Sequence, residues 1–142
     1  MGAGVRDLLK LLPIYAISLL AQLVFQYVNF SFMFSRLKNG NLKIPVSEHI
    51  FSSWWSFTVA AWLFNATFYL AGSLLTVWAY KLSIDSFGGL YSGFIVASIA
   101  AIIMSVFFMY IFAGEVPNKN GWIALILVVL ASFFAANSGK GV

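Results

Sequence analysis

The segment LLPIYAISLLAQLVFQYVNFSFMFS, Leu11–Ser35, decides the fold of this chain because none of its residues is Asp, Glu, Lys or Arg. An uncharged, mostly apolar stretch longer than about 18 residues is typical of a helix that crosses a lipid bilayer. Three further uncharged stretches follow, at Ile50–Tyr80, Ser86–Gly114 and Asn120–Gly139. The sequence therefore predicts an all-α membrane protein with four transmembrane helices, at about residues 13–34, 53–80, 87–113 and 121–137.

The composition favours the same fold class and excludes others. Of 142 residues, 62% are hydrophobic and 8% are charged, and the mean hydropathy is +0.95. Soluble domains carry about 25% charged residues. Four spans use nearly the whole chain, so we expect a single transmembrane domain over residues 1–142. The net charge of +4 lies mainly between the spans, where it suits lipid head groups rather than nucleic acid. The absence of cysteine excludes disulfides and thiolate metal sites.

The basic residues do not decide the orientation of the chain. With four spans, one side of the membrane carries Arg6, Lys10, Lys81 and Lys140, and the other carries Arg36, Lys38, Lys43 and Lys119. The positive-inside rule gives no preference when the two sides are equal. Either individual charges set the orientation, or the chain pairs with an oppositely oriented copy or relative. The second interpretation predicts an antiparallel dimer of the inverted-repeat kind.

Polar side chains recur on one face of the first predicted span. They are Tyr15, Ser18, Gln22, Gln26 and Asn29, at intervals of three and four residues. An amide in hydrocarbon needs a partner, so this stripe is expected to face protein or a polar cavity. Two interpretations remain open. The amides stabilise helix contacts, at about 1 kcal/mol each, or they line a site for a polar substrate.

The second and third spans carry two further patterns. In the second span Asn65 and Tyr69 belong to an aromatic and amide face with Thr58, Trp62, Ser73 and Thr76, which suits a sugar or ordinary packing. The third span carries small residues at every fourth position, which favours close helix packing. These are Gly89, Gly93, Ala97, Ala101 and Ser105.

Catalytic chemistry is missing from the sequence. His49 is the single histidine and lies beside Glu48 in a polar segment. No metal-ligand spacing, nucleophile and base pair, or glycine-rich phosphate loop is present. We therefore expect neither an enzyme nor a bound cofactor or metal.

Three segments resemble the small multidrug resistance branch of the drug/metabolite transporter superfamily. They are AQLVFQ (Ala21–Gln26), SFGGLYSGF (Ser86–Phe94) and FAGEVPNKNGWIALILVVLASFF (Phe112–Phe134). The multidrug and guanidinium exporters of this family use a glutamate of the first helix, and Gln22 stands at the matching position. Because glutamine does not ionise, the resemblance is nearest to the paired small flippase subunits that move undecaprenyl-phosphate-linked aminoarabinose.

The resemblance implies translocation of a lipid-linked sugar across a bacterial inner membrane. It also implies that Tyr91 contacts the substrate and that Phe94 is the aromatic residue nearby. Together with the polar faces, it predicts a groove lined by Gln22, Gln26 and Asn29, with Asn65, Tyr69 and Tyr91 opposite. The phosphate would be held by three basic residues, Arg36, Lys38 and Lys81. The alternative interpretation is that these residues anchor the chain on ordinary lipid head groups.

Two other functions remain open from the sequence. One is export of small polar or cationic solutes, for which Glu115 is the acid nearest to a span. The other is an accessory subunit of a membrane glycosyltransferase or similar complex. The expected partners are membrane lipids, the lipid-linked sugar, and a second copy or a related small subunit. No nucleic acid is expected.

Overall fold

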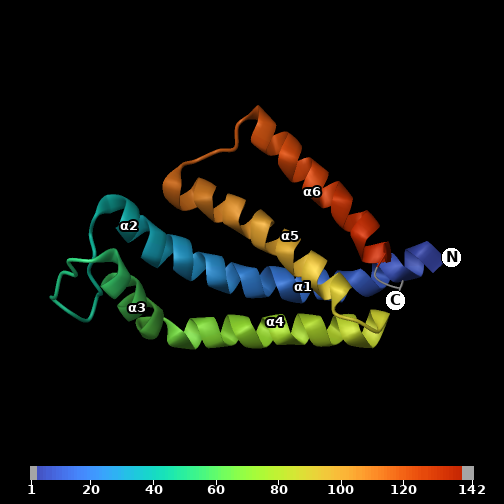
Figure 1. Cartoon of the computed structure of the whole chain (residues 1–142), viewed down its shortest axis with the longest axis horizontal. Helices are drawn as coiled ribbons and strands as arrows, with labels where there is room; N and C mark the ends of the chain where they lie inside the picture. Colours follow the sequence, from blue (N-terminus) through green and yellow to red (C-terminus); the bar gives the residue numbers. More distant parts are fainter. Residues whose placement is uncertain (1–2, 139–142) are drawn as a thin grey trace.

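The first long helix of the computed structural model, which describes residues 3–138, runs without interruption to Asn39 (Figure 1). It consists of α1 (Ala3–Val28), a π-helical segment η1 (Asn29–Phe34) and the short α2 (Ser35–Asn39). Gly40 ends it in the left-handed conformation, with φ 71°. A glycine tolerates this conformation because it has no Cβ. The predicted first span lies entirely inside this helix.

The structure divides the predicted second span into two helices. They are α3 (Trp54–Phe64) and α4 (Ala66–Phe87), which meet at Asn65 with a bend of 70°. The side-chain amide of Asn65 donates a hydrogen bond to the backbone carbonyl of Ala61, at 2.9 Å. An asparagine that bonds nearby backbone in this way competes with the regular helical ladder. The break therefore has a local cause that hydropathy does not report.

The third and fourth predicted spans form the last three helical segments. They are α5 (Tyr91–Phe108), a second π-helical segment η2 (Met109–Ala113) and α6 (Lys119–Ser138). The sequence predicts a short hinge at residues 81–85, between the second and third spans, but α4 continues through it to Phe87. The turn before α5 therefore covers only residues 88–90. Gly114 ends η2 with φ 66°, and a connection without regular secondary structure leads to α6.

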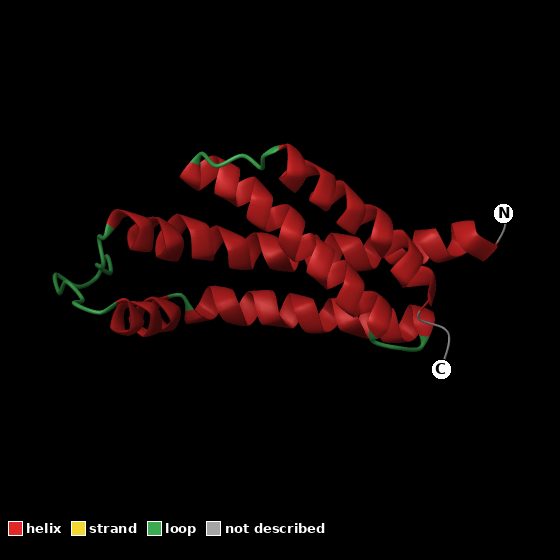
Figure 2. Cartoon of the chain, turned by 45° about the horizontal axis from the view of Figure 1, so that its top comes forward, coloured by secondary structure: helices red, strands yellow, loops and turns green. Residues whose placement is uncertain are grey.

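Helix α1 is the centre of the packing and contacts both α4 and α5 along their lengths. Its Leu11 and Ile14 form a buried cluster with Ala79 of α4 and Val96 of α5. A second cluster joins Met33 to the segment after α2 and to α3; its other members are Ile44, Phe57 and Ala61. Helices and loops make up the described chain, with one isolated bridge between Lys43 and Ile50 (Figure 2). Helix α6 lies against α5 only over part of its length (Figure 1).

Two helices are long and apolar enough to cross a membrane, at Val5–Asn39 and Tyr91–Ala113. The bent pair α3 and α4 makes a third if it counts as one span. In α6 the apolar part within the described residues covers Lys119–Ser132 and is shorter. The all-helical prediction and the membrane character are thus supported, whereas four spans and a dimer stay predictions. Lys140, which the predicted charge balance includes, lies outside the described residues.

Candidate functional site

Tyr69 of α4 is the centre of a cluster that joins three helices. Its hydroxyl donates a hydrogen bond to the side-chain oxygen of Asn29 on the first helix. Its ring centroid lies 6.0 Å from that of Phe25 on α1 and 6.3 Å from that of Trp62 on α3. Trp62 is stacked on Tyr69 and is 52% exposed. The cluster therefore presents one accessible aromatic face beside a half-buried polar contact.

Two irregularities of the backbone meet at this cluster. Asn29 is the first residue of the π-helical segment η1, and Tyr69 follows the break at Asn65 by one helical turn. Phe32 of η1 stacks on Phe64, the last residue of α3, at 5.5 Å between ring centroids. Single π-helical turns and broken membrane helices occur frequently at functional sites. This coincidence marks the Tyr69 cluster as the candidate site.

The side chains of the predicted polar stripe on the first helix contact different partners in the structure. The amide of Gln26 donates to the side-chain oxygen of Gln22 at 3.3 Å, and both residues are half-buried. The hydroxyl of Ser18 is buried and has no hydrogen-bond partner in the structure. Tyr15 instead reaches α6, where its hydroxyl lies 3.2 Å from that of Ser132. Of the stripe, Asn29 contacts the Tyr69 cluster directly, and Gln26 lies one helical turn before it.

The three predicted phosphate-binding residues have different surroundings. Lys38 forms an exposed ion pair with Glu115, at 3.2 Å, and Lys81 pairs with Asp85 one helical turn away. The guanidinium of Arg36 lies 4.2 Å from the centroid of the Phe32 ring. One of its nitrogen atoms, Nη1, is buried and has no hydrogen-bond partner. Of the three, Arg36 is the one whose side chain is not paired with a carboxylate.

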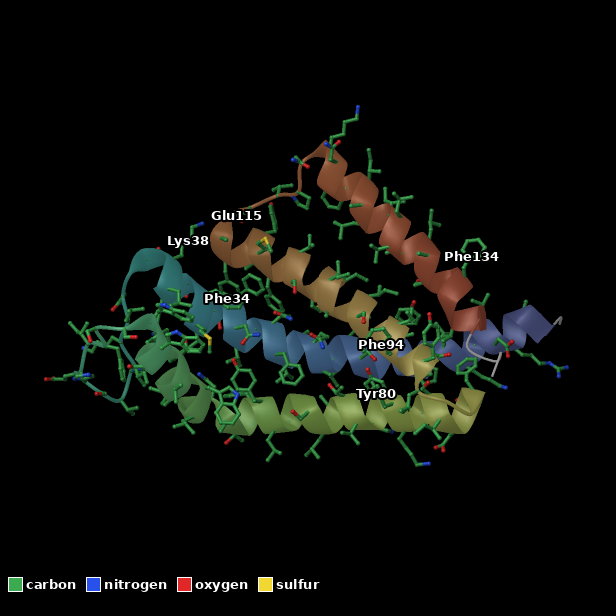
Figure 3. All side chains as sticks on the ribbon, in the orientation of Figure 1. Phe34, Lys38, Tyr80, Phe94, Glu115 and Phe134 are labelled. Carbon is green, nitrogen blue, oxygen red and sulfur yellow. The ribbon has the colours of Figure 1, made fainter. Side chains whose placement is uncertain are left out.

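The structure places the predicted Tyr91 and Phe94 away from this cluster. Both lie at the start of α5 and are about half exposed. The start of α5 adjoins the buried contact of Val96 with Ala79, which is ten residues along α4 from Tyr69. Ten helical residues span about 15 Å. Figure 3 shows Phe94 far from Phe34 and Lys38, which mark the other end of the molecule. These two side chains and the Tyr69 cluster thus occupy different levels of the helix bundle.

The small residues predicted on the third span contribute unequally to packing. Gly93 is buried, and a Cβ built on it would lie 3.0 Å from the Cβ of Ser83. The same addition to Gly89 meets nothing within 4 Å. The remaining three, Ala97, Ala101 and Ser105, are half-buried, whereas Val96 and Ala100 are fully buried. The buried face of α5 is therefore rotated slightly from the predicted ladder.

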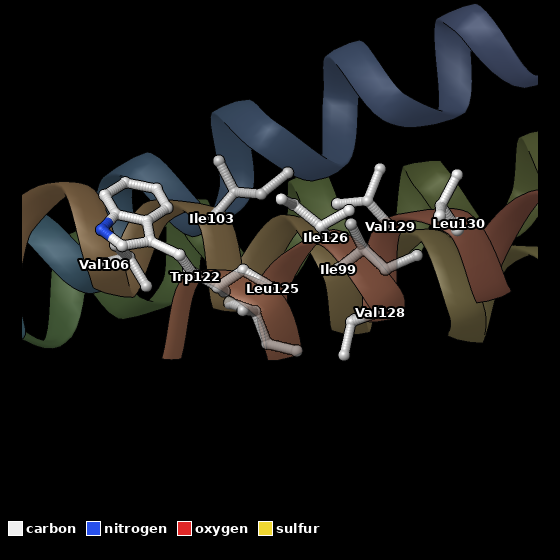
Figure 4. Close-up of a pocket in the computed structure, with 10 residues that line it drawn as sticks. Ile99, Ile103, Val106, Trp122, Leu125, Ile126, Val128, Val129 and Leu130 are labelled. Atoms are coloured by element: carbon white, nitrogen blue, oxygen red, sulfur yellow. The ribbon is translucent and has the colours of Figure 1, made fainter. Parts of the chain in front are cut away.

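A cavity of about 350 Å³ separates α5 from α6 (Figure 4). Every residue lining it is apolar, including Ile99, Ile103 and Val106 on α5 and Trp122 and Ile126 on α6. The indole N–H of Trp122 is the one polar group among these side chains. Within residues 3–138, no three His, Cys, Asp or Glu side chains come together to hold a metal ion.

Sequence reasoning identified Gln22, Gln26, Asn29, Asn65 and Tyr69 as candidates but did not select Trp62. Trp62 was one member of a loose aromatic face, and its stacking on Tyr69 depends on the bend at Asn65. Asn65 itself is buried and bonded to the α3 backbone. The asparagine in the middle of a long apolar stretch was the one available signal of that bend.

Comparison with protein-family models, curated proteins and solved structures finds no match to this chain. The structure itself defines a class: an all-helical protein with two or three helices able to cross a membrane, and a neutral polar and aromatic cluster where two irregular helices meet.

Proposed function

We propose that this chain is a small membrane transporter that moves the polar head group of a polyprenyl-phosphate-linked sugar across the bilayer. The observation that carries the proposal is the Tyr69 cluster, in which an accessible indole stacks on the tyrosine that bonds Asn29, and Asn29 follows Gln22 and Gln26 at helical spacing on the same helix. A sugar presents apolar ring faces that stack on aromatic side chains, and hydroxyls that bond amides. Both kinds of contact are available here without a fixed charge inside the membrane.

Each residue of the cluster has a separate role in this proposal. Trp62 stacks on the sugar ring, because its face is exposed and Tyr69 supports it from behind. Gln22 and Gln26 bond the sugar hydroxyls, since they are half-buried and bond only to each other in the structure. Asn29 and Tyr69 hold the two helices together at this level.

Arg36 binds the phosphate in the proposed function. It follows Asn29 by two helical turns on the same helix and has a buried nitrogen without an acceptor. A guanidinium forms two parallel hydrogen bonds to a phosphate, which gives it strength and direction. Lys38 and Lys81 are less suited to this role because each is already paired with a carboxylate.

The proposal includes four spans, insertion in a bacterial inner membrane, and pairing with a second copy or a related small subunit. The resemblance to the drug/metabolite transporter superfamily supports these features. Export of cationic solutes finds less support, because Glu115 is exposed and paired with Lys38 rather than adjoining the polar row.

The test measures flipping in vesicles that contain the purified protein. The probe is a farnesyl-phosphate-linked hexose carrying a nitrobenzoxadiazole label, whose outer-leaflet fraction is read by dithionite quenching. We expect Trp62→Leu to slow flipping about fivefold, since one aromatic contact contributes about 1 kcal/mol. Gln26→Leu should slow it by a similar factor.

Trp78→Leu is the matched control for this test. Trp78 and Trp62 are both 52% exposed, but Trp78 lies on α4 away from the polar row. If the wild type, Trp62→Leu and Gln26→Leu all flip the probe at the same rate, the proposed site is overturned. No flipping above protein-free vesicles would overturn transport by this chain alone and favour the accessory-subunit interpretation.

A further inference from the structure

A second cavity, of about 370 Å³, lies between the ends of the first and third long helices. Aromatic and thioether side chains line its interior, and three polar residues lie at its edge. The interior residues are Phe30, Phe34, Met109 and Phe112, and the polar ones are Ser35, Lys38 and Glu115. Figure 3 shows Phe34, Lys38 and Glu115 close together at this end of the molecule. Its volume is in the range of small-molecule sites.

The two helices build this cavity in the same way. Each contains a π-helical segment, η1 or η2, whose residues supply the aromatic walls. Each then ends at a glycine in the left-handed conformation, Gly40 or Gly114. The amide of Glu115 bonds back to the carbonyl of Met109 at 3.4 Å, which fixes the acid at the edge. The charged edge therefore lies where both helices leave the apolar region.

The ion pair at the edge is easily replaced. The Lys38 and Glu115 side chains are 57% and 59% exposed, although their charged atoms lie 3.2 Å apart. Exposed pairs of this kind contribute little to stability. A ligand with a phosphate and an ammonium group would exchange one ion pair for two and leave neither charge alone. A purely anionic ligand would instead face the carboxylate of Glu115.

From this charge arrangement we infer that the cavity binds a bilayer phospholipid with a phosphate and a primary ammonium group, of the phosphatidylethanolamine type. Lys38 bonds the phosphate and Glu115 accepts a hydrogen bond from the ammonium. The upper part of one acyl chain lies against Phe30 and Phe34. A choline head group lacks the N–H donors that Glu115 would accept, so it binds more weakly.

This site is separate from the proposed sugar site. None of the residues that line it belongs to the Tyr69 cluster, and Arg36 takes no part in it. The inference rests on insertion of the chain in a membrane, not on transport. A failed flipping assay would therefore leave it standing.

The experiment is native mass spectrometry of the purified full chain in detergent, titrated with dimyristoyl lipids. The probes are phosphatidylethanolamine, phosphatidylcholine and phosphatidylglycerol at equal concentrations. We expect about tenfold tighter binding of the ethanolamine lipid than of the other two, since a hydrogen bond to a charged group accounts for such a factor. Glu115→Gln should remove this preference, and Lys38→Gln should weaken binding of all three lipids.

Asp85→Asn is the matched control, because Asp85 belongs to an exposed ion pair with Lys81 that borders none of the described cavities. It should leave the lipid preference unchanged. Equal binding of the three lipids by the wild type would overturn the inference, as would an equal loss of preference in Asp85→Asn. Competition by soluble phosphoethanolamine at the same concentration would overturn the role of the acyl chain and the aromatic walls.

Discussion

The two connections on either side of α5 join helices of similar apolarity, yet they produce different packing. Before α5, the hydroxyl of Ser83 donates to the carbonyl of Gly89 at 2.7 Å and accepts from the amide of Gly93 at 2.9 Å. The helices α4 and α5 approach closely there. After α5, residues 114–118 have no regular secondary structure and an apolar cavity separates α5 from α6.

This difference shows what holds helices together in an apolar solvent. Lipid chains are as apolar as leucine, so burying aliphatic side chains between helices gives little net driving force. Small residues that allow close contact, and buried polar groups that need partners, supply it instead. The α4 and α5 pair has both, whereas the large cavity between α5 and α6 is lined by no small residue and by no hydroxyl or amide side chain. Four variants can test this account.

Gly93→Leu should have the largest effect on stability. A Cβ at this position already lies 3.0 Å from Ser83 and 3.1 Å from the Tyr80 ring. Overpacking of this kind costs about 3 kcal/mol. Thermal unfolding in detergent, followed by circular dichroism, measures the loss. Gly89→Ala is the control, because nothing lies within 4 Å of the added carbon; equal losses in both variants would contradict the close approach.

Ser83→Ala should have the second largest effect. Ser83 is fully buried, and removing its hydroxyl leaves the Gly89 carbonyl and the Gly93 amide without their hydrogen-bond partner. A buried polar group without a partner costs about 2 kcal/mol. The same unfolding measurement applies. Ser73→Ala, on the exposed side of α4, is the comparison; a change in Ser83→Ala no larger than in Ser73→Ala would show that the hydroxyl is dispensable.

A pair of identical substitutions compares the two interfaces directly. Val96 is fully buried among α1, α4 and α5, whereas Val128 lines the cavity between α5 and α6 and is 36% exposed. Val96→Ala should cost about 1.5 kcal/mol through lost packing contacts. Val128→Ala should cost much less, because lipid replaces the missing contacts. Equal midpoints of unfolding for the two variants would contradict the proposed difference in packing between the two interfaces.

Ser132→Ala should have the smallest effect on global stability and the clearest local one. The contact of its hydroxyl with that of Tyr15, at 3.2 Å, links α6 to α1. Interhelical hydrogen bonds in membranes contribute about 0.6 kcal/mol. We expect faster hydrogen exchange in α6 and unchanged exchange in α4. Slower or unchanged exchange in α6 would show that other contacts hold it.

The pattern of charges predicted where the long helices lie, because a run of apolar residues has few alternatives to a helix in a membrane. It did not predict the break at Asn65. Hydropathy is averaged over many residues, so a single asparagine whose side-chain amide bonds the backbone carbonyl of Ala61 hardly changes it. The charge pattern also placed a hinge at residues 81–85, where Lys81 and Asp85 instead pair along a continuing helix. A pair of opposite charges one turn apart supports a helix rather than ending it.

The candidate site was predicted in part for the same physical reasons. Helical spacing placed Gln22, Gln26 and Asn29 near one another, and the structure joins Asn29 to Tyr69. The resemblance grouped Tyr91 with residues that lie about 15 Å along the bundle, because a short motif does not give the level at which two helices cross. Helical spacing could not select Trp62, whose position depends on a bend.

The π-helical segment η1 gives the first long helix a property that a regular helix lacks. A π-helical turn contains an additional residue, and each residue of an α-helix turns the chain by about 100°. Rewinding η1 into α-helical geometry would rotate α2 relative to α1 by that angle while the rod stays intact. The Asn29 contact on one side of η1 and the Lys38 ion pair on the other then could not both keep their partners. The two sites described above are therefore coupled by the number of residues in one helical turn.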